Sequence, residues 1–160
     1  MWNWQSRNGP LIAPYIHALK GSNHRAVFDF WSHKFIIRHH LLAAESKEIL
    51  FVPVPSQRRI NHANSFASSL AGLLGSKTTD ALKVTEAGEQ KFKSRLERQR
   101  IRFAVNENIS LYDLKKKRVI IVDDILTTGA TAQAAYIALG SPEGSEVWTL
   151  GYRSPQTKDK

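Results

Sequence analysis

The chain has 160 residues, of which 42% are hydrophobic and 23% are charged, as is typical of one soluble globular domain with a hydrophobic core. The absence of cysteine excludes disulfides and thiolate zinc sites. The formal net charge of +9 indicates anionic partners, either phosphorylated substrates or nucleic acid. Since no apolar run has the length of a membrane span and no signal peptide is evident, we expect a cytoplasmic protein.

The N-terminal part of the chain predicts helices. Apolar residues recur at helical spacing within 11–19, and a longer helix is expected from about His24 to Ala44. We therefore expect residues 1–45 to form a helical segment packed on the core. His39 and His40 are neighbours on the longer helix, so they point about 100° apart and make a poor metal chelate.

A first strand is predicted by Ile49-Leu50-Phe51-Val52 and ends in Pro53-Val54-Pro55-Ser56, because proline cannot continue a central ladder. The segment that follows this strand, Pro55-Ser56-Gln57-Arg58, is a candidate phosphate clamp. Arginine suits this role because its guanidinium binds phosphate oxygens bidentately. The alternative interpretation is a turn stiffened by proline, with solvated arginines.

The next predicted helix runs from His62 to about Leu74, with Asn61 as its N-cap and Gly75 at its end. Its expected apolar face consists of Ala63, Phe66, Ala67, Leu70, Leu73 and Leu74. We expect short strands at 79–85 and at 103–105, separated by a polar and strongly basic stretch.

The stretch from Glu86 to Arg102 lacks an apolar stripe and carries six basic residues close together: Lys91, Lys93, Arg95, Arg98, Arg100 and Arg102. Such a stretch within a small domain is typical of a functional lid or of a partly disordered loop. A second basic run, Lys115 to Arg118, is interpreted as the solvated entrance to the central strand.

The central feature is the segment Val119 to Thr131, VIIVDDILTTGAT. Four β-branched apolar residues predict a strand buried on both faces, which then ends in Asp123 and Asp124. A Thr/Gly loop follows and opens an alanine-rich helix, Ala132 to Leu139. Backbone N–H groups and the helix dipole at such a loop favour a phosphate, while the carboxylates favour hydroxyl hydrogens or a hydrated cation. The alternative is a capped helix after a buried strand, with solvated carboxylates.

A last strand is expected at Glu146 to Tyr152, after a loop from Gly140 to Gly144. Strands that alternate with helices predict an α/β fold with a mostly parallel sheet. We expect residues 46–153 to form its core and residues 154–160 to form a disordered tail.

The segment Val119 to Thr131 resembles the phosphoribosyl-pyrophosphate (PRPP) binding motif of type I phosphoribosyltransferases, in which a hydrophobic strand, two acidic residues and a T-T-G-x-T loop follow one another. The resemblance implies the type I phosphoribosyltransferase fold. It also implies that Asp123 and Asp124 bind the ribose hydroxyls. The residues that would then hold the 5′-phosphate are Thr127, Thr128, Gly129, Ala130 and Thr131.

The wider chain resembles the ComF group of these enzymes, which is connected with competence and DNA uptake. The resemblance is carried by Ala18-Leu19-Lys20-Gly21, by Val52-Pro53-Val54-Pro55, by Arg58 to Ala63, and by Gln90 to Arg98. The chain departs from the group in three respects. It lacks the four-cysteine zinc module, Arg59 replaces a glycine, and His62 replaces a glutamine.

This resemblance implies a Mg²⁺-dependent phosphoribosyltransferase, a pentosyl-group glycosyltransferase. Asp123 or Asp124 would reach Mg²⁺ directly or through water, Ser56 and Arg58 would hold the pyrophosphate, and Arg95 and Arg98 would belong to a catalytic lid. The acceptor stays open between a nucleobase, an amine and water, and so does the oligomeric state.

A second hypothesis is a non-catalytic module that senses PRPP or binds single-stranded DNA through residues 91–102. That stretch supplies charge, but Phe92 and Phe103 are its only stacking candidates. A metal-dependent phosphatase using Asp123 would leave the TTG loop unexplained.

Overall fold

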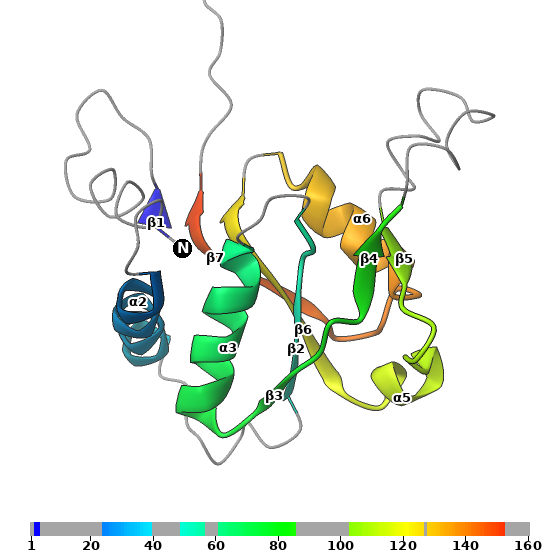
Figure 1. Ribbon diagram of the computed structural model, residues 1–160, viewed down its shortest axis with the longest axis horizontal. Helices are drawn as coiled ribbons and strands as arrows, with labels where there is room; N and C mark the ends of the chain where they lie inside the picture. Colours follow the sequence, from blue (N-terminus) through cyan, green and yellow to red (C-terminus); the bar gives the residue numbers. More distant parts are fainter. Residues whose placement is uncertain are drawn as a thin grey trace, which may run out of the picture.

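The computed structural model describes residues 2–3, 24–39, 49–56, 61–85, 103–126 and 128–152. Its centre is a five-stranded parallel sheet in the order β1-β7-β6-β2-β3, and β4 and β5 form a separate antiparallel ribbon (Figure 1). The strands are β1 (Trp2–Asn3), β2 (Ile49–Pro53), β3 (Lys77–Thr78), β4 (Leu82–Val84), β5 (Phe103–Val105), β6 (Arg118–Leu126) and β7 (Glu146–Tyr152). The helices are α2 (His24–Arg38), α3 (His62–Leu74), α5 (Leu111–Lys115) and α6 (Ala130–Ala138).

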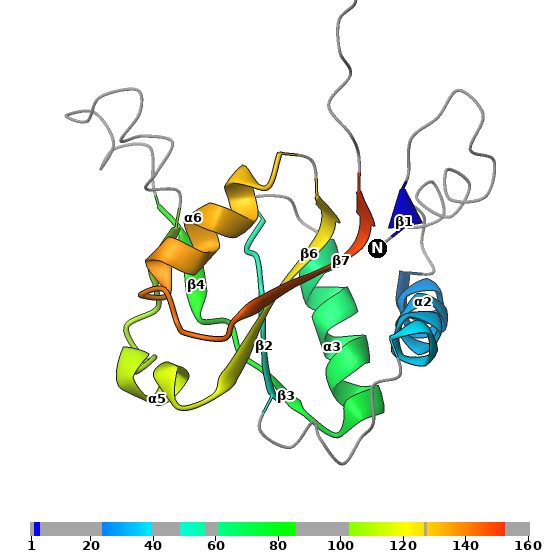
Figure 2. The ribbon, with the colours of Figure 1, turned by 180° about the vertical axis from the view of Figure 1, so that it is seen from behind.

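Strand β6 lies in the middle of the sheet and divides the core into two layers. Ile120 and Val122 pack with residues of α2 and α3 on one face. Val119 and Ile121 pack on the other face with residues of α5, α6 and the β4–β5 ribbon, and the reverse view in Figure 2 shows the same separation. All four side chains are fully buried. The predicted α/β fold, with a parallel sheet flanked by helices, is therefore confirmed.

Strand β2 contains a proline at its last position. Thr79 N donates to Phe51 O at 2.9 Å, so Phe51 faces β3 in the ladder. The backbone N–H and C=O groups of successive residues point to alternate sides of a strand, so Pro53 faces the same side as Phe51, toward β3. Pro53 has no N–H to donate there, and the pairing of β2 with β3 ends before it. The prediction that the prolines end this strand is confirmed, although Pro53 itself still pairs with Val122 of β6.

Helix α3 begins and ends where the sequence predicts. The Asn61 side chain accepts a hydrogen bond from Asn64 N at 3.2 Å, and Gly75 ends the helix with a left-handed φ of 66°. The helix buries the expected face except for Leu73, which is 43% exposed. The expectation for Leu73 was therefore wrong.

Helix α2 is shorter than predicted, because it ends at Arg38 and His39 is already in a turn. Phe28 and Phe35 are buried in the same core as Phe66 of α3 and Phe51 of β2. Within the described residues, α2 thus packs directly on α3 and contributes to the core of the sheet. The expected helix at 11–19 and the whole tail at 154–160 lie outside the described residues, and the domain division stays a prediction.

Three further elements differ from the expectation. The strand predicted at 79–85 is shorter, Leu82–Val84, and joins the ribbon, while an unpredicted strand just before it, Lys77–Thr78, joins the parallel sheet. The short helix α5 was not predicted, although Ser110 caps it by accepting from Asp113 N at 3.3 Å. The backbone of Trp2–Asn3 adds an edge strand beside β7, where the sequence predicted no strand.

Two aromatic residues of the parallel sheet, Phe51 and Trp148, are part of the core. Phe51 is fully buried, Trp148 is 7% exposed, and their ring centroids lie 5.5 Å apart. These residues pack the face of the sheet that α2 and α3 cover.

Among the helices of the described ranges, none is both long enough and apolar enough to cross a membrane.

Candidate functional site

The candidate site lies at the carboxyl end of β6, where this strand extends beyond β2. Pairing with β2 ends at Val122, whose carbonyl also accepts from Val54 N at 2.9 Å. Pairing with β7 continues as far as Leu126 and Tyr152. The sequence predicted that the strand ends in Asp123 and Asp124, but it continues to Leu126 because β7 extends the ladder. Asp123 and Asp124 therefore lie within the extension of β6, supported by β7 alone.

The two carboxylates belong to opposite faces of the sheet. Side chains alternate along a strand, so Asp123 falls on the face of Val119 and Ile121, and Asp124 on the face of Ile120 and Val122. Asp123 Oδ1 accepts from Asp124 N at 2.9 Å, and Asp124 Oδ1 accepts from Ile125 N at 2.8 Å. These local bonds restrict the rotation of both carboxylates. Each oxygen has two lone pairs, so they also retain acceptor capacity for ligand hydroxyls.

Asp124 also contacts the beginning of α3. Its Oδ2 lies 3.5 Å from Nδ1 of His62, the first residue of that helix. The two side chains are 33% and 18% exposed, respectively, so the contact is partly shielded from water. From the sequence, His62 is predicted as the first residue of this helix and is a departure from the ComF pattern, without a role at the site.

The loop after β6 opens α6 as expected. Gly129 is the N-cap with φ of 77°, a left-handed conformation that favours glycine, and Ala130 begins the helix two residues before the predicted start. Thr128 Oγ1 accepts from Ala130 N at 3.3 Å, which leaves the hydroxyl hydrogen as a donor. The first N–H groups of a helix have no carbonyl partner within it, so this terminus suits an anion. Of the predicted phosphate residues, Thr127 lies outside the described residues.

The third part of the predicted site follows β2. Pro55 and Ser56 follow this strand after Val54, at the same edge of the sheet as Asp123 and the N-terminus of α6, the upper edge in Figure 1. Asn61 Nδ2 donates to Val54 O at 3.2 Å and so joins the start of α3 to the end of β2.

Several predicted site residues cannot be placed. Gln57 and Arg58 of the candidate pyrophosphate loop lie outside the described residues, as do Arg95 and Arg98 of the predicted lid. The strands that flank the basic stretch in the chain, β4 and β5, pair from Val84 and Phe103 onward.

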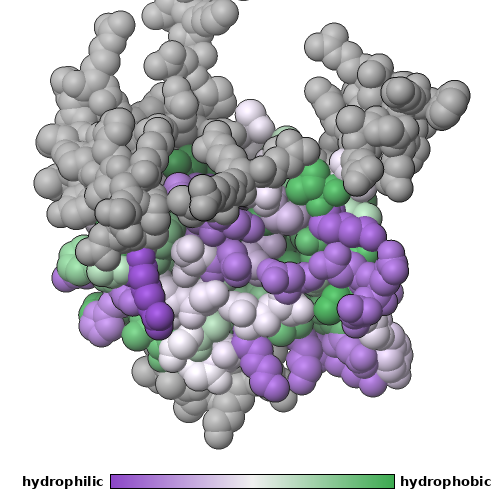
Figure 3. All heavy atoms as spheres, viewed as in Figure 1, coloured by the Kyte–Doolittle hydropathy of each residue, from purple (hydrophilic) through white to green (hydrophobic). Residues whose placement is uncertain are grey.

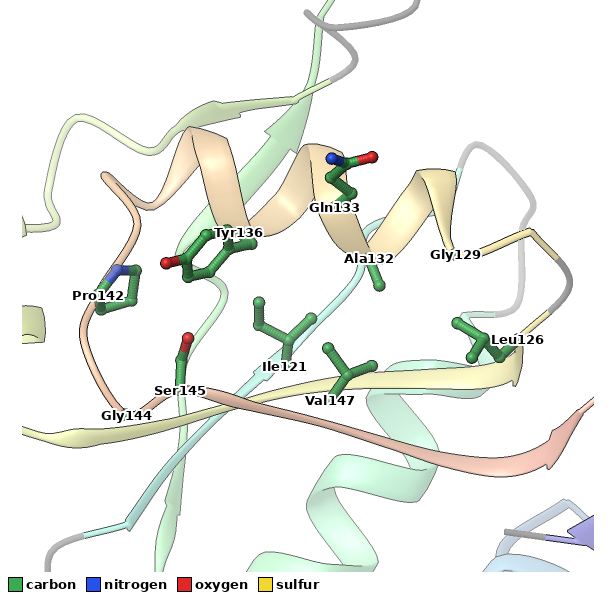
Figure 4. A pocket seen from close by; sticks show the side chains of 10 residues that line it. All are labelled: Ile121, Leu126, Gly129, Ala132, Gln133, Tyr136, Pro142, Gly144, Ser145 and Val147. Carbon is green, nitrogen blue, oxygen red and sulfur yellow. The ribbon is translucent and has the colours of Figure 1, made fainter.

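A pocket that the sequence did not predict adjoins the candidate site on the α6 face. It has a volume of about 430 Å³, lies between α6 and strands β6 and β7, and includes Leu126 and Gly129 at one end (Figure 4). Figure 4 shows Ile121 and Val147 on the sheet side, opposite Ala132 and Tyr136 of α6. The lining is largely apolar, so this pocket does not supply charge for a phosphate.

The residues at the edge fit a magnesium ion held mainly by water and phosphate. Mg²⁺ keeps several waters and takes only one or two carboxylates, so a dedicated protein cage is not required. No group of three or more His, Cys, Asp or Glu residues suited to a metal occurs in the described part of the chain. Because Asp123 and Asp124 face opposite sides, contact with one ion would involve one of them directly or either through water.

Comparison with known proteins identifies neither a family model nor a curated protein that matches this chain.

Proposed function

We propose that this protein binds PRPP together with Mg²⁺ and acts as a phosphoribosyltransferase of the type that the ComF resemblance implies. One observation carries the proposal: β6 brings two adjacent carboxylates to the edge of a parallel sheet, shortly before a helix whose N-cap, Gly129, has a left-handed φ. Ligands of open α/β sheets bind outside the carboxyl ends of the strands, which supports a ligand at this edge.

The proposed ligand matches the polar groups of this edge part by part. The 5′-phosphate accepts hydrogen bonds from the N-terminus of α6 and from the hydroxyls of Thr128 and Thr131. The ribose hydroxyls donate to Asp123 and Asp124, since carboxylates only accept. Ser56 would bind the pyrophosphate, together with Gln57 and Arg58 of the predicted pyrophosphate loop.

The proposed reaction transfers the ribosyl group from pyrophosphate to an acceptor. The bond between C1 of the ribose and the pyrophosphate oxygen breaks, the pyrophosphate leaves with the electron pair, and a nucleophile forms the new bond at C1. A bound Mg²⁺ would neutralise the negative charge that the leaving pyrophosphate carries. Asp123 and Asp124 hold the ribose in position, and Arg95 and Arg98 exclude water above it. The acceptor is a nucleobase, an amine or water.

Calorimetry with PRPP and Mg²⁺ tests the proposal. The wild-type chain should bind, and the Asp123→Asn, Asp124→Asn double variant should lose at least about tenfold in affinity, because two charge-assisted hydrogen bonds are weakened. Asp113→Asn is the matched control, since Asp113 is an exposed carboxylate in α5 and should not affect binding. Equal binding by wild type and double variant, or no binding by either, would refute the proposal.

A second candidate function, binding of single-stranded DNA, is favoured by one surface feature. Tyr112 of α5 is 68% exposed, and Lys116 Nζ lies 3.9 Å from its ring centroid. Lys115 and Lys117 are also exposed, and Figure 3 shows hydrophilic residues at the corner where Figure 1 places α5. An exposed aromatic ring among lysines suits a base stacked beside its phosphates. The basic stretch 91–102 remains the other proposed contact.

Titration of a labelled thymidine oligonucleotide at increasing salt tests this second function. Affinity should fall steeply with salt, and Tyr112→Ala should weaken binding at least about fivefold through lost stacking. Lys77→Ala, which removes an exposed lysine of β3, is the control and should change affinity little. Affinity that is independent of salt would exclude this function.

A further inference from the structure

The position of His62 is determined by contacts on more than one side. It is the first residue of α3, and its side chain is only 18% exposed. The ring of Phe28, a fully buried residue of α2, lies 6.0 Å from the imidazole between centroids. The preceding residue, Asn61, is tied to β2 by its bond to Val54 O at 3.2 Å. The imidazole is therefore placed by the packing of α2 and by the anchored start of α3.

Both oxygens of the Asp124 carboxylate have a protein contact. Oδ1 accepts from Ile125 N at 2.8 Å, and Oδ2 lies 3.5 Å from His62 Nδ1. A carboxylate can only accept, so the contact with His62 is attractive when Nδ1 carries a proton. The carboxylate thus accepts from a backbone donor of its own strand at one oxygen and lies 3.5 Å from a side chain of α3 at the other.

We infer that His62 is a positioning residue of the ribose site, which holds the Asp124 carboxylate in the orientation that accepts ribose hydroxyls. This inference rests on the proposed function and adds to it a residue outside the β6–α6 motif. A carboxylate that is oriented before the ligand arrives loses less conformational freedom on binding, so the ligand binds more tightly.

Replacement of His62 should affect the ribose part of the ligand and not the pyrophosphate part. His62 acts through Asp124, so its removal weakens ligands that carry the ribose and does not affect a ligand that lacks it. A purely structural role at the start of α3 would affect the neighbouring loop after β2 as well, because Asn61 joins the two. Ribose 5-phosphate and pyrophosphate without Mg²⁺ therefore serve as separate probes, since Mg²⁺ could itself contact Asp124.

The experiment measures the affinity of both probes, and of PRPP, for wild type, His62→Leu and His62→Asn. The leucine variant should bind ribose 5-phosphate and PRPP roughly three- to tenfold more weakly, as expected for the loss of one polar side-chain contact, and should bind pyrophosphate unchanged. The asparagine variant should recover most of this loss, because its amide nitrogen occupies the place of Nδ1. His33→Leu is the matched control, since His33 is exposed on α2 and should change nothing.

A double-mutant cycle with Asp124→Asn tests the route of the effect. His62→Leu should have no further effect on ribose 5-phosphate once Asp124 is replaced, because the contact is already weakened. The inference is overturned if the two effects add, if asparagine is no better than leucine, or if pyrophosphate binding falls equally. Failure of the wild type to bind either ribose 5-phosphate or PRPP would remove the proposed function, and this inference with it.

A measurement without ligand tests the His62–Asp124 contact separately from PRPP binding. It also does not depend on the folding of the His62→Leu variant. In a nitrogen-15 spectrum of the imidazole side chains, the His62 Nδ1 resonance should shift in Asp124→Asn, while the His33 resonances stay in place. An unchanged His62 resonance would show that His62 does not hold Asp124, whatever the protein binds.

Discussion

At the residue scale, Gly129 combines a backbone requirement with the candidate phosphate site. Its φ of 77° is left-handed, and a Cβ added there would meet no atom within 4 Å. Gly129→Ala should therefore cost about 1–2 kcal/mol of stability through backbone strain alone. It should also weaken phosphate binding, because the strain is relieved by shifting the loop. Chemical denaturation and calorimetry with ribose 5-phosphate measure the two effects.

Gly75 provides the matched control for this substitution. It has a φ of 66°, also has space for a Cβ, and ends α3 at the opposite end from His62. Gly75→Ala should lose a similar amount of stability and leave phosphate binding unchanged. An equal loss of phosphate affinity in both variants would mean that Gly129 acts through global stability only.

Glu146, the first residue of β7, should make the stability of the protein depend on pH. Partial burial alone raises the pKa of Glu146, but hydrogen bonds from Trp148 and Arg118, with the charge of Arg118, outweigh it, so the pKa lies below its ordinary value of 4.5. A carboxyl with a lowered pKa in the folded state contributes stability above its unfolded pKa, and this contribution is lost as the pH falls through the folded pKa.

Glu146→Gln should therefore destabilise the protein at neutral pH, and the difference from wild type should shrink as the pH falls below about 4.5. Urea denaturation across this pH range measures it. Glu107→Gln is the control, because Glu107 pairs with Lys83 at 3.2 Å on an exposed surface, where an ion pair contributes little. If the difference in the free energy of unfolding between wild type and Glu146→Gln grew as the pH fell, the lowered pKa of Glu146 would be contradicted.

At the scale of elements, the start of α3 is stabilised by one side chain with two bonds. Asn61 accepts from Asn64 N and donates to Val54 O, both at 3.2 Å. Asn61→Ala should cost about 1–2 kcal/mol, whereas Asn61→Asp keeps the cap and loses only the bond to Val54. Thermal unfolding should rank wild type above Asn61→Asp and Asn61→Asp above Asn61→Ala. Equal stability of the three would show that neither bond matters.

Ser110→Ala is the matched cap removal in α5. Ser110 also accepts from a backbone N–H, that of Asp113 at 3.3 Å, but it caps an exposed helix of five residues. Its loss should cost less than that of Asn61, since it makes no second bond to the sheet.

Most elements that local signals specify were predicted from the sequence, with the capped helix α5 as an exception. Helix α3 has a cap at Asn61 and a terminating Gly75, and β7 is a continuous strand pattern, so both were confirmed. The end of β2 depends on a local signal, Pro53. The extension of β6 through Asp123 and Asp124 depends instead on pairing with β7. Pairing partners are distant in sequence, so the extension was not predicted.

The candidate site shows the same division. The motif from Asp123 to Thr131 is local and was recognised from its residues, whereas the contact of His62 with Asp124 joins two segments that only the fold brings together. The sequence does indicate roughly where His62 lies. It directly follows the N-cap Asn61, and a helix that follows a parallel strand begins near the carboxyl end of that strand. The sequence therefore indicates that His62 lies at the carboxyl edge of the sheet, but not that it contacts Asp124.

At the scale of the whole molecule, α2 behaves as part of the core. Phe28 is fully buried and packs against Phe66 of α3 at 6.5 Å between ring centroids. Phe28→Ala should cost about 3–5 kcal/mol and lower the stability of the entire sheet in one transition. Denaturation followed by both tryptophan fluorescence and circular dichroism measures this.

Phe30 of the same helix is the matched control. It is 48% exposed, so Phe30→Ala should change stability by less than about 1 kcal/mol. Separate transitions in the two signals of Phe28→Ala would show instead that α2 unfolds independently of the sheet.

The central claim is that PRPP binds at the carboxyl edge of the sheet, and backbone amide chemical shifts test its location most directly. Addition of PRPP and Mg²⁺ to the nitrogen-15-labelled chain should shift the amides of Ser56, His62, Asp123 to Ile125, and Thr128 to Ala132. The amides of Leu111 to Lys115 in α5 should stay unchanged. Absence of shifts, or shifts confined to α5, would contradict the account.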